Sequence, residues 1–309
     1  MPELADRTQV PEAPAAPGDL LLGWRASNPY WLDLDLYAQA LVARAGTAAA
    51  EASVALAALA ARMTAVPSAD RQRAMIRLIA SLIGTGVWDR LDALWLPAAH
   101  DAQAGRLNWI GDRYNLTAVN SPAWTADRGY KGDGAAAYLS TGFVGGGATD
   151  KCQQSSATVG VYVQQLAAAG TTCLAGSTDT GAPGGSAGTR VMMRYETAGP
   201  TYHMLAVNDA SNSVSAAGAL AALGLYTVTR NSAATSEAYL GSQLIESRTS
   251  ASRSLSTELY LLADHFIASG ANFPATERIS AAFVGGGLTA PQVANLSAAL
   301  GAYLTTLGA

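Results

Sequence analysis

Residues 225–245, LYTVTRNSAATSEAYLGSQLI, decide the fold class of this chain. Within them, Leu225–Arg230 alternates in side-chain character and is rich in Thr, Val and Tyr, which is typical of a half-buried strand. We interpret Asn231–Ser236 as a polar loop, Glu237–Leu240 as a second strand and Gly241-Ser242 as a tight turn into a third strand. This order predicts an antiparallel meander and hence a mainly β protein.

The composition of the whole chain favours a rigid, loop-rich β protein. Its 309 residues are enough for one sizeable core and an accessory region, and they include 31 Gly and only 14% charged residues. The formal net charge is −4, and the sequence contains no block of Lys or Arg. Because binding to nucleic acid depends on a basic surface, the composition excludes nucleic acid as a partner.

The N-terminal sequence MPELADRTQVPEAPAAPGD is acidic and proline-rich. A signal peptide needs a basic start and an apolar run, so we expect no signal peptide here. The apolar segment Ala52–Ala61 is about ten residues long, whereas a bilayer span needs roughly 20, so we expect no membrane insertion. Cys152 and Cys173 are interpreted as buried free thiols. A disulfide between neighbouring strands is the alternative.

The composition and the hydrophobic periodicity of the sequence divide the chain into three regions. Residues 1–20 form an extended Pro/Ala-rich arm. Residues 21–97 show helical periodicity. From residue 98 to residue 309, short β-type runs alternate with Gly, Asn, Ser and Asp clusters, and a helix closes the chain. We therefore predict an arm, a helical region and a β domain with a C-terminal helix.

Three helices are predicted. The first covers the Ala-rich segment Leu36–Met63, and the second begins after Ser68 as N-cap and ends at Gly84-Thr85-Gly86. The third follows Thr289 as N-cap, with a proline in its first turn and Gly308 at its end. The apolar positions expected at helical intervals are Leu41, Val54, Leu56, Leu59 and Met63, then Met75, Leu78, Ile79 and Leu82, then Val293, Leu296, Leu300, Tyr303 and Leu304.

Short runs of β-type residues between turn signals predict strands with the spacing of a sandwich or jelly roll. The predicted strands are Thr117–Asn120, Ala137–Phe143, Thr158–Gln165, Thr172–Ala175, Arg190–Glu196, Tyr202–Asn208, Leu225–Arg230, Glu237–Leu240, Leu259–Ala263 and Arg278–Val284.

Three segments together carry a resemblance to a known family. YKGDGAAAYLSTGF (130–143) resembles the first strand of concanavalin A-like, laminin-G-type jelly rolls, and residues 225–245 are similar to their central meander. Residues 256–300 are similar to the closing strands and trailing helix of that family. The overall texture also resembles virion-associated fibre and spike proteins of bacteriophages and gene transfer agents. The resemblance to jelly rolls implies a lectin-like binding domain, and the resemblance to virion proteins implies that residues 21–97 are a helical attachment region.

Catalytic chemistry is not indicated. Cleavage of a glycan with retention needs two carboxyl groups about 5 Å apart. The only carboxylates spaced to share one face of a strand, Asp33 and Asp35, lie outside the predicted sandwich. No Ser-centred elbow or His/Cys metal cluster is present, and we interpret His100 and His265 as structural. Calcium is the one candidate cofactor, with Asn208-Asp209 as sparse ligands alongside Asp179, and a turn-forming Asn/Asp pair is the alternative.

Sugar recognition combines aromatic surfaces with fixed polar groups. Tyr195, Tyr202 and His203 lie on neighbouring predicted strands, and Asn and Asp side chains follow in the next loops. The alternative is that these tyrosines fill the core of the sandwich or its edge. The predicted carbohydrate-binding residues are Tyr195, Tyr202, His203, Asn208, Asp209 and Asn231.

These observations favour a non-catalytic, carbohydrate-binding virion protein that adheres to host surface or capsular polysaccharide. The N-terminal arm would contact head or tail proteins of a particle assembled in the host cytoplasm, and many copies would supply avidity. Two alternatives stay open: a structural decoration protein that makes only protein–protein contacts, and a polysaccharide depolymerase. The oligomeric state also stays open.

Overall fold

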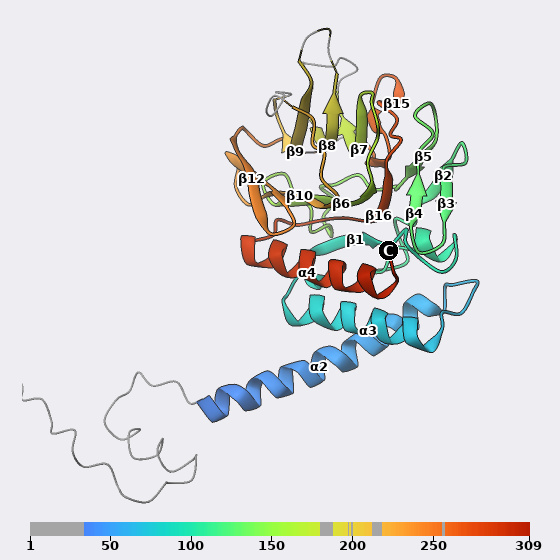
Figure 1. Ribbon diagram of the computed structural model, residues 1–309. Coiled ribbons are helices and arrows are strands. Elements are labelled where there is room, and N and C mark those ends of the chain that lie inside the picture. The colour runs from blue at the N-terminus through green and yellow to red at the C-terminus, as the bar shows by residue number, and fades with distance from the viewer. Residues whose placement is uncertain (1–33, 180–187, 197, 199, 212–217, 255–256) are drawn as a thin grey trace, which may run out of the picture. The chain divides into compact units, whose positions relative to one another are not determined.

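The computed structural model describes residues 34–179, 188–196, 198, 200–211, 218–254 and 257–309. Residues 47–309 form one compact unit, and residues 1–46 are assigned to another. The predicted arm at residues 1–20 lies outside the described residues. The compact unit consists of two large sheets and a layer of helices (Figure 1). The predicted antiparallel β-sandwich with N-terminal helices and a C-terminal helix is therefore confirmed.

Sheet A lies between the helices and the other sheet (Figure 1). Its strand order is β12-β11-β10-β6-β16-β4-β3, and β1 also pairs with β16. The predicted meander is its β10-β11-β12 edge, where Gly241 supplies a positive φ of 62° in the turn between the last two strands. The bounds of its strands are β1 Leu91–Trp95, β3 Ala123–Thr125, β4 Gly129–Lys131, β6 Ala157–Gln165, β10 Gly224–Arg230, β11 Thr235–Leu240, β12 Gln243–Thr249 and β16 Arg278–Gly285.

Sheet B forms the second layer of the sandwich. Its strands follow the order β15-β14-β7-β13-β5-β2, and outside this path β8 pairs with β7 and β9 pairs with β8. The pairs are antiparallel except β14 with β7, which is parallel. The bounds are β2 Thr117–Val119, β5 Tyr138–Ser140, β7 Thr172–Thr178, β8 Gly188–Tyr195, β9 Tyr202–Asp209, β13 Tyr260–Leu261, β14 Asp264–Phe266 and β15 Gly270–Asn272.

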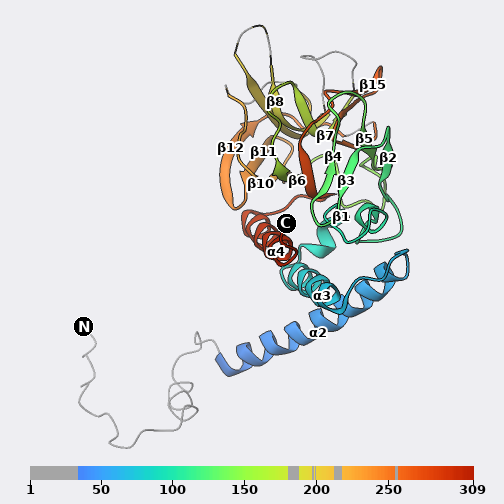
Figure 2. The same cartoon turned by 45° about the vertical axis from the view of Figure 1, so that its right-hand side comes forward.

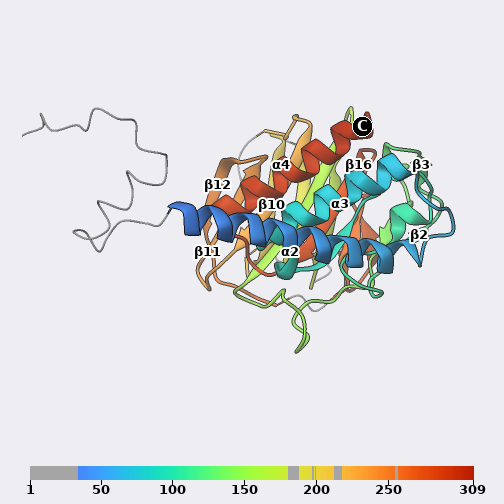
Figure 3. The ribbon, with the colours of Figure 1, turned by 90° about the horizontal axis from the view of Figure 1, so that it is seen from below.

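Helices α3 (Ala69–Gly84) and α4 (Ala290–Thr306) cover the face of sheet A that points away from sheet B (Figures 1 and 2). They lie side by side when viewed from below (Figure 3). The third described helix is α2 (Leu34–Ala60), whose Ala52, Leu56 and Leu59 join the apolar core of α3 and α4. Two 3-10 turns, η1 (Trp88–Arg90) and η2 (Ala104–Arg106), flank β1.

The helix ends agree with the sequence prediction. The Ser68 side chain accepts a hydrogen bond from the backbone N–H of Arg71 at the start of α3. At the start of α4, the Thr289 backbone N–H donates to the Gln292 side chain, which completes a capping box. All five predicted core positions of α4 are buried. The structure therefore confirms the predicted apolar stripe of this helix.

Two separate apolar cores result from this layering. One lies between the sheets and includes Val161, Val228 and Leu261. The other lies between sheet A and the helices and includes Leu78, Leu296 and Phe283. A smaller cluster of Cys173, Met192 and Met204 belongs to neither core.

The edge strand β9 of sheet B is closed by arginines from sheet A. Arg230 Nε donates to the carbonyl of Val207 at 3.0 Å, and Arg248 Nη1 donates to that of Leu205 at 3.3 Å. Both guanidinium groups lie within 4 Å of Asp209 Oδ2. These bonds occupy backbone carbonyls that an edge strand otherwise leaves open to another chain.

Several details differ from the sequence prediction. Residues 91–95, assigned there to the helical region, form β1 and pair with β16, and the short strands β3, β4, β14 and β15 were missed. Val54 is 72% exposed rather than part of an apolar stripe, because Ala52 and Leu56 turn the opposite side of α2 inward. Cys152 and Cys173 are buried free thiols, as favoured. Within the described residues, no helix is long and apolar enough to span a membrane.

Candidate functional site

The outer face of sheet B, which we define as the face pointing away from sheet A, carries half-buried aromatic side chains. Leu139 and Leu261 are fully buried in the core between the sheets. Because neighbouring residues of a strand point to opposite faces, Tyr138 and Tyr260 point outward. Figure 1 shows no helix on that side of the sandwich. These tyrosines therefore lie on a face that the described helices leave open.

Three rings form a stack on this outer face. The centroids of Tyr138 and Tyr260 are 4.4 Å apart with an interplanar angle of 25°. The ring of His265 lies 4.0 Å from that of Tyr260 with an interplanar angle of 1°. Each of the three residues is half-buried. No ligand fits between rings at these separations, so a ligand can contact only the edges and the two end faces of the stack.

A chain reversal brings His265 to this stack. Tyr260 and Leu261 run antiparallel to β7, Leu262 adopts a positive φ of 66°, and β14 then runs parallel to β7. The backbone of Asp264 passes over Gly176, where a Cβ would lie 2.7 Å from the Asp264 Cα. Glycine at 176 therefore permits the close approach that places His265 beside Tyr260.

Fixed polar groups surround the stack. Glu258 Oε1 accepts hydrogen bonds from the Ser140 hydroxyl and from the backbone N–H of Gly142, the latter at 2.7 Å. His265 Nδ1 lies 2.9 Å from the carbonyl oxygen of Glu258 and 3.0 Å from Thr257 Oγ1. The carbonyl can only accept, so this geometry assigns the proton of the neutral ring to Nδ1.

The phenol of Tyr260 stays protonated over a wide pH range. Burial raises its pKa, and a hydrogen bond with Tyr138 and the nearby Glu258 carboxylate raise it further. A protonated phenol can donate and accept hydrogen bonds but is a poor general base near neutral pH. Its chemistry at this site is therefore hydrogen bonding rather than proton abstraction.

A buried ion pair holds β14 onto sheet B. Arg190 Nε donates to Asp264 Oδ2 at 2.6 Å, and the Thr178 hydroxyl lies 3.1 Å from both carboxylate oxygens. Burial raises the pKa of Asp264, while Arg190 and Thr178 act in the opposite direction. The guanidinium of Arg190 also lies over the ring of Phe266, 5.4 Å from its centroid. This carboxyl group serves the packing of the strand and is withdrawn from solvent.

A second aromatic group lies on the same face, at the β8–β9 hairpin. Tyr195 and Tyr202 are directly opposite each other, and Tyr195 meets Phe273 edge-on at 6.0 Å. Phe273 also meets Phe266 edge-on, at 5.5 Å. Tyr202 shares its face with Met204, which is buried outside the core between the sheets. The two predicted tyrosines are thus brought together on the outer face of sheet B.

The structure separates the other predicted site residues from these tyrosines. His203 points to the opposite face of β9, where its Nδ1 lies 2.9 Å from the carbonyl oxygen of Gly218 and its Nε2 lies 3.8 Å from Glu246 Oε2. Asn208 and Asp209 lie at the far end of β9, roughly 20 Å from Tyr202 along the strand.

Asn208 and Asp209 are both buried and serve local structure. The Asn208 side-chain amide donates to the carbonyls of Gln153 and Gln154. The Asp209 carboxylate accepts hydrogen bonds from Ser211 and Ser250.

The predicted calcium ligands do not fit a metal ion. Asp209 Oδ2 faces Arg230 at 3.9 Å and Arg248 at 3.7 Å, and Asp179 is paired with Arg253 at 3.1 Å. Calcium binds several oxygen ligands, and a guanidinium beside the carboxylate opposes a cation. Among the described residues, no group of three His, Cys, Asp or Glu side chains could hold a metal ion.

Two carboxyl groups that are distant in the sequence, those of Asp92 and Asp150, lie close to each other at one end of the sandwich. Asp92 accepts hydrogen bonds from the backbone N–H groups of Lys151 and Cys152, and Arg113 lies 3.6 Å from Asp92 and 3.3 Å from Asp150. Burial raises the pKa of Asp92. The side chains of Asp92 and Asp150 are buried, and the side chain of Arg113 lies between them and the solvent. This cluster fastens the 147–152 loop to β1.

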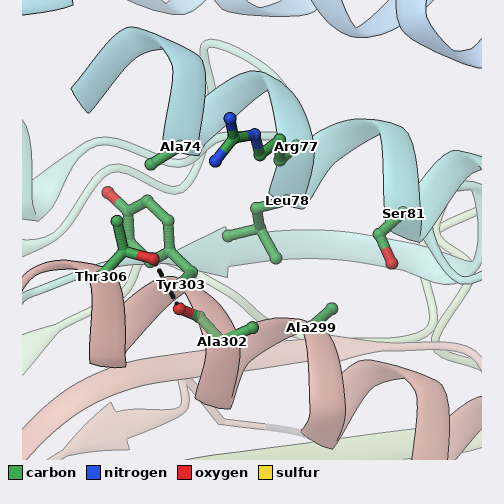
Figure 4. A pocket seen from close by; sticks show the side chains of 8 residues that line it. All are labelled: Ala74, Arg77, Leu78, Ser81, Ala299, Ala302, Tyr303 and Thr306. Atoms are coloured by element: carbon green, nitrogen blue, oxygen red, sulfur yellow. Dashed lines mark hydrogen bonds between the residues drawn. The ribbon is translucent and has the colours of Figure 1, made fainter. Parts of the chain in front are cut away.

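Hollows among the described residues lie away from the outer face of sheet B, and two of them contain residues considered above or in Figure 4. One, of about 240 Å³, runs between α3 and α4 and is lined by small and apolar side chains with Arg77 and Ser81 (Figure 4). The Thr306 hydroxyl at its rim donates to the carbonyl of Ala302. The other, of about 130 Å³, lies at the β10–β11 loop and includes the predicted residue Asn231, whose amide donates to the carbonyl of Leu288. Both are smaller than most ligand sites of roughly 300–1,000 Å³.

Comparisons with known proteins give only distant similarities. No family model and no curated protein sequence matches the chain. Among solved structures, a mutant of Trypanosoma rangeli sialidase with trans-sialidase activity is 11% identical over 77% of this chain and 40% of its own, with a TM-score of 0.43. The botulinum neurotoxin serotype D binding domain is 10% identical over 68% and 52%, also with a TM-score of 0.43. Neither similarity assigns an activity or a ligand to this chain.

Proposed function

We propose that the protein binds carbohydrate, without cleaving it, through the outer face of sheet B. The observation that carries this proposal is the half-buried stack of Tyr138, Tyr260 and His265 beside the fixed carboxylate of Glu258. Aromatic surface next to oriented hydrogen-bonding groups is the combination that sugar recognition requires. The tyrosine pair at the β8–β9 hairpin extends the same face, so a polymer could contact both groups.

Two features favour binding over cleavage. Hydrolysis of a glycosidic bond generally needs a second carboxyl group near the first. The next carboxyl group after Glu258 in the chain, Asp264, is fully buried and paired with Arg190. The raised pKa of Tyr260 also makes its phenol a poor base. The groups at the stack are thus suited to holding hydroxyl groups in place.

The finer proposal is that this binding attaches a virion to host surface or capsular polysaccharide, with residues 1–20 contacting head or tail proteins. It is supported by the texture of the sequence and by its resemblance to virion fibre and spike proteins. Deleting residues 1–20 should abolish incorporation into particles while leaving glycan binding intact. Normal incorporation of the truncated chain would contradict the role of the arm.

The test of carbohydrate binding uses the full chain against a panel of neutral, amine-bearing and acidic polysaccharides, with affinities from calorimetry. Tyr260→Phe removes one phenol oxygen and should weaken binding by roughly 2- to 10-fold. Tyr260→Ala should weaken it further, because the centre of the stack is lost. Tyr162→Phe is the matched control, since Tyr162 is half-buried on the helix-covered side of sheet A.

Two results would overturn the proposal. The first is the absence of binding to every polysaccharide in the panel, which would favour a protein that makes only protein–protein contacts. The second is equal affinity of the Tyr260→Phe, Tyr162→Phe and unaltered chains for the bound glycan. Each incubation is also assayed for new reducing or unsaturated ends of the polysaccharide. Their appearance would show depolymerase activity and would contradict the proposal of binding without cleavage.

A further inference from the structure

We infer that the stack selects glycans that present hydroxyl or ammonium donors and discriminates against glycans that carry carboxylate or sulfate groups. This inference rests on the proposed function and names the class of glycan for the same site. It follows from three properties of the residues around the stack: the orientation of one carboxylate, the proton position on one imidazole, and the pairing of the basic residues of sheet B.

The first property is the fixed orientation of Glu258. Its Oε1 accepts from the Ser140 hydroxyl and from the Gly142 backbone N–H, so the carboxylate is held in place from below. Its Oε2 accepts none of the hydrogen bonds found among the described residues, and the side chain is half-buried rather than enclosed. An oriented carboxylate oxygen of this kind accepts from hydroxyl or ammonium groups and repels another anion.

The second property is the proton position on His265. Because its Nδ1 donates to the carbonyl of Glu258, the neutral ring has an acceptor at Nε2. The contact from Nε2 to Thr257 Oγ1 is long, at 3.5 Å. The site therefore offers acceptors on His265 and on the neighbouring Glu258, which is the arrangement that suits a ligand rich in donors.

The third property is the pairing of the basic residues. Within the described part of sheet B, the arginines on strands are Arg190 and Arg194. Arg190 is buried against Asp264, and Arg194 lies 3.2 Å from Glu196. Beyond the strands, Arg253 is paired with Asp179. A glycan carboxylate or sulfate is usually bound by an arginine or lysine, and these guanidinium groups already face carboxylates.

The experiment compares glycans that differ in charge on one backbone: dextran, diethylaminoethyl-dextran and dextran sulfate, alongside chitosan oligomers, hyaluronan and polysialic acid. Calorimetry on the unaltered full chain is run at 0.15 M and 0.5 M salt, because the net charge of −4 also repels anions at long range and salt screens that effect. The tightest binders should be neutral or amine-bearing, with at least about tenfold higher affinity than the acidic glycans at both salt concentrations.

A variant then assigns the discrimination to one group. Glu258→Gln keeps an acceptor oxygen but removes the charge, and it should reduce the preference for uncharged over acidic glycans by about fivefold or more. Glu237→Gln is the matched control, because it makes the same change in net charge on sheet A, where Glu237 accepts from the Tyr239 hydroxyl. The control should leave the preference unchanged. Equal loss of preference in both variants would overturn the assignment to Glu258.

The outcomes separate this inference from the proposed function. If no glycan binds, the proposed function fails and the inference fails with it. If a glycan binds through the stack but the tightest binders are acidic, the inference alone is overturned. Should Glu258→Gln fail to fold, the comparison of uncharged and acidic glycans on the unaltered chain still decides between these outcomes.

Discussion

The two outer faces of the sandwich differ in how they use aromatic side chains. On sheet A, Phe283 and Tyr239 are buried under α3 and α4 and belong to an apolar core. On sheet B, Tyr138 and Tyr260 remain half-buried, stacked on each other and hydrogen-bonded to each other. Aromatic side chains therefore support the fold on sheet A and are open to a ligand on sheet B. The two faces differ because helices cover the face of sheet A and leave that of sheet B open.

The largest expected effect concerns the helix-covered face. Leu296 on α4 is fully buried, so Leu296→Ala should lower the free energy of unfolding by about 2–5 kcal/mol. Tyr260→Ala on the open face should cost clearly less, because its side chain is only half-buried. Chemical denaturation of both variants measures the two costs. If the two costs are equal, the assignment of one face to stability and the other to binding is wrong.

Alkaline pH should act on the helix-covered face as well. Burial raises the pKa of Tyr303 to about 12 from an ordinary value of 10.0. Because the folded pKa is the higher one, this contribution to stability is complete below pH 10 and is lost as the pH rises through about 12. The loss is on the order of 2–3 kcal/mol.

Absorbance at 295 nm and denaturation as functions of pH measure this effect. Tyr303→Phe is the control, and it should remove the component that appears between pH 10 and about 12. An unchanged alkaline profile in that variant would show that Tyr303 does not contribute.

The open face depends on one glycine. A Cβ at position 176 would lie 2.6–2.7 Å from atoms of Asp264, including its Cα, so Gly176→Ala should displace β14 and destabilise the fold by about 1–3 kcal/mol. Glycan binding should fall with it, because His265 leaves the stack. Gly84→Ala is the control, since a Cβ there would meet nothing within 4 Å. Full binding by folded Gly176→Ala would contradict a role of β14 in the site.

The smallest expected effect concerns the turn before Tyr138. The Asp133 carboxylate accepts hydrogen bonds from the backbone N–H groups of residues 135–137, and these bonds lower its pKa. A lowered folded pKa means that the contribution to stability is present above the ordinary value of 3.8 and is lost at more acidic pH. Asp133 is exposed, so the loss is less than about 1 kcal/mol.

Thermal unfolding between pH 2 and pH 6 tests this contribution. Asp133→Asn cannot titrate, so its stability should vary less over that range than the stability of the unaltered chain. Identical pH dependence of the two proteins would assign the acid sensitivity to other groups.

The sequence predicted the meander, the caps of α3 and α4 and most of the longer strands, because each rests on local periodicity and turn residues. It did not predict the ring stack. Residues 259–263 resemble one continuous strand, and if that strand continued to residue 265, Tyr260 and His265 would point to opposite faces. The positive φ at Leu262 reverses the chain and joins the two rings on one face. Such a reversal depends on Gly176 and Asp264, which are distant in sequence.

The arginines that close the edge of β9 also bear on how the protein behaves at high concentration. Arg230 and Arg248 place positive charge at the carbonyls of Val207 and Leu205, where a neighbouring molecule would otherwise add a strand. A row of open backbone groups is a template for strand exchange and fibre formation. Because these two carbonyls are filled from within the sandwich, this part of the β9 edge is closed to an added strand.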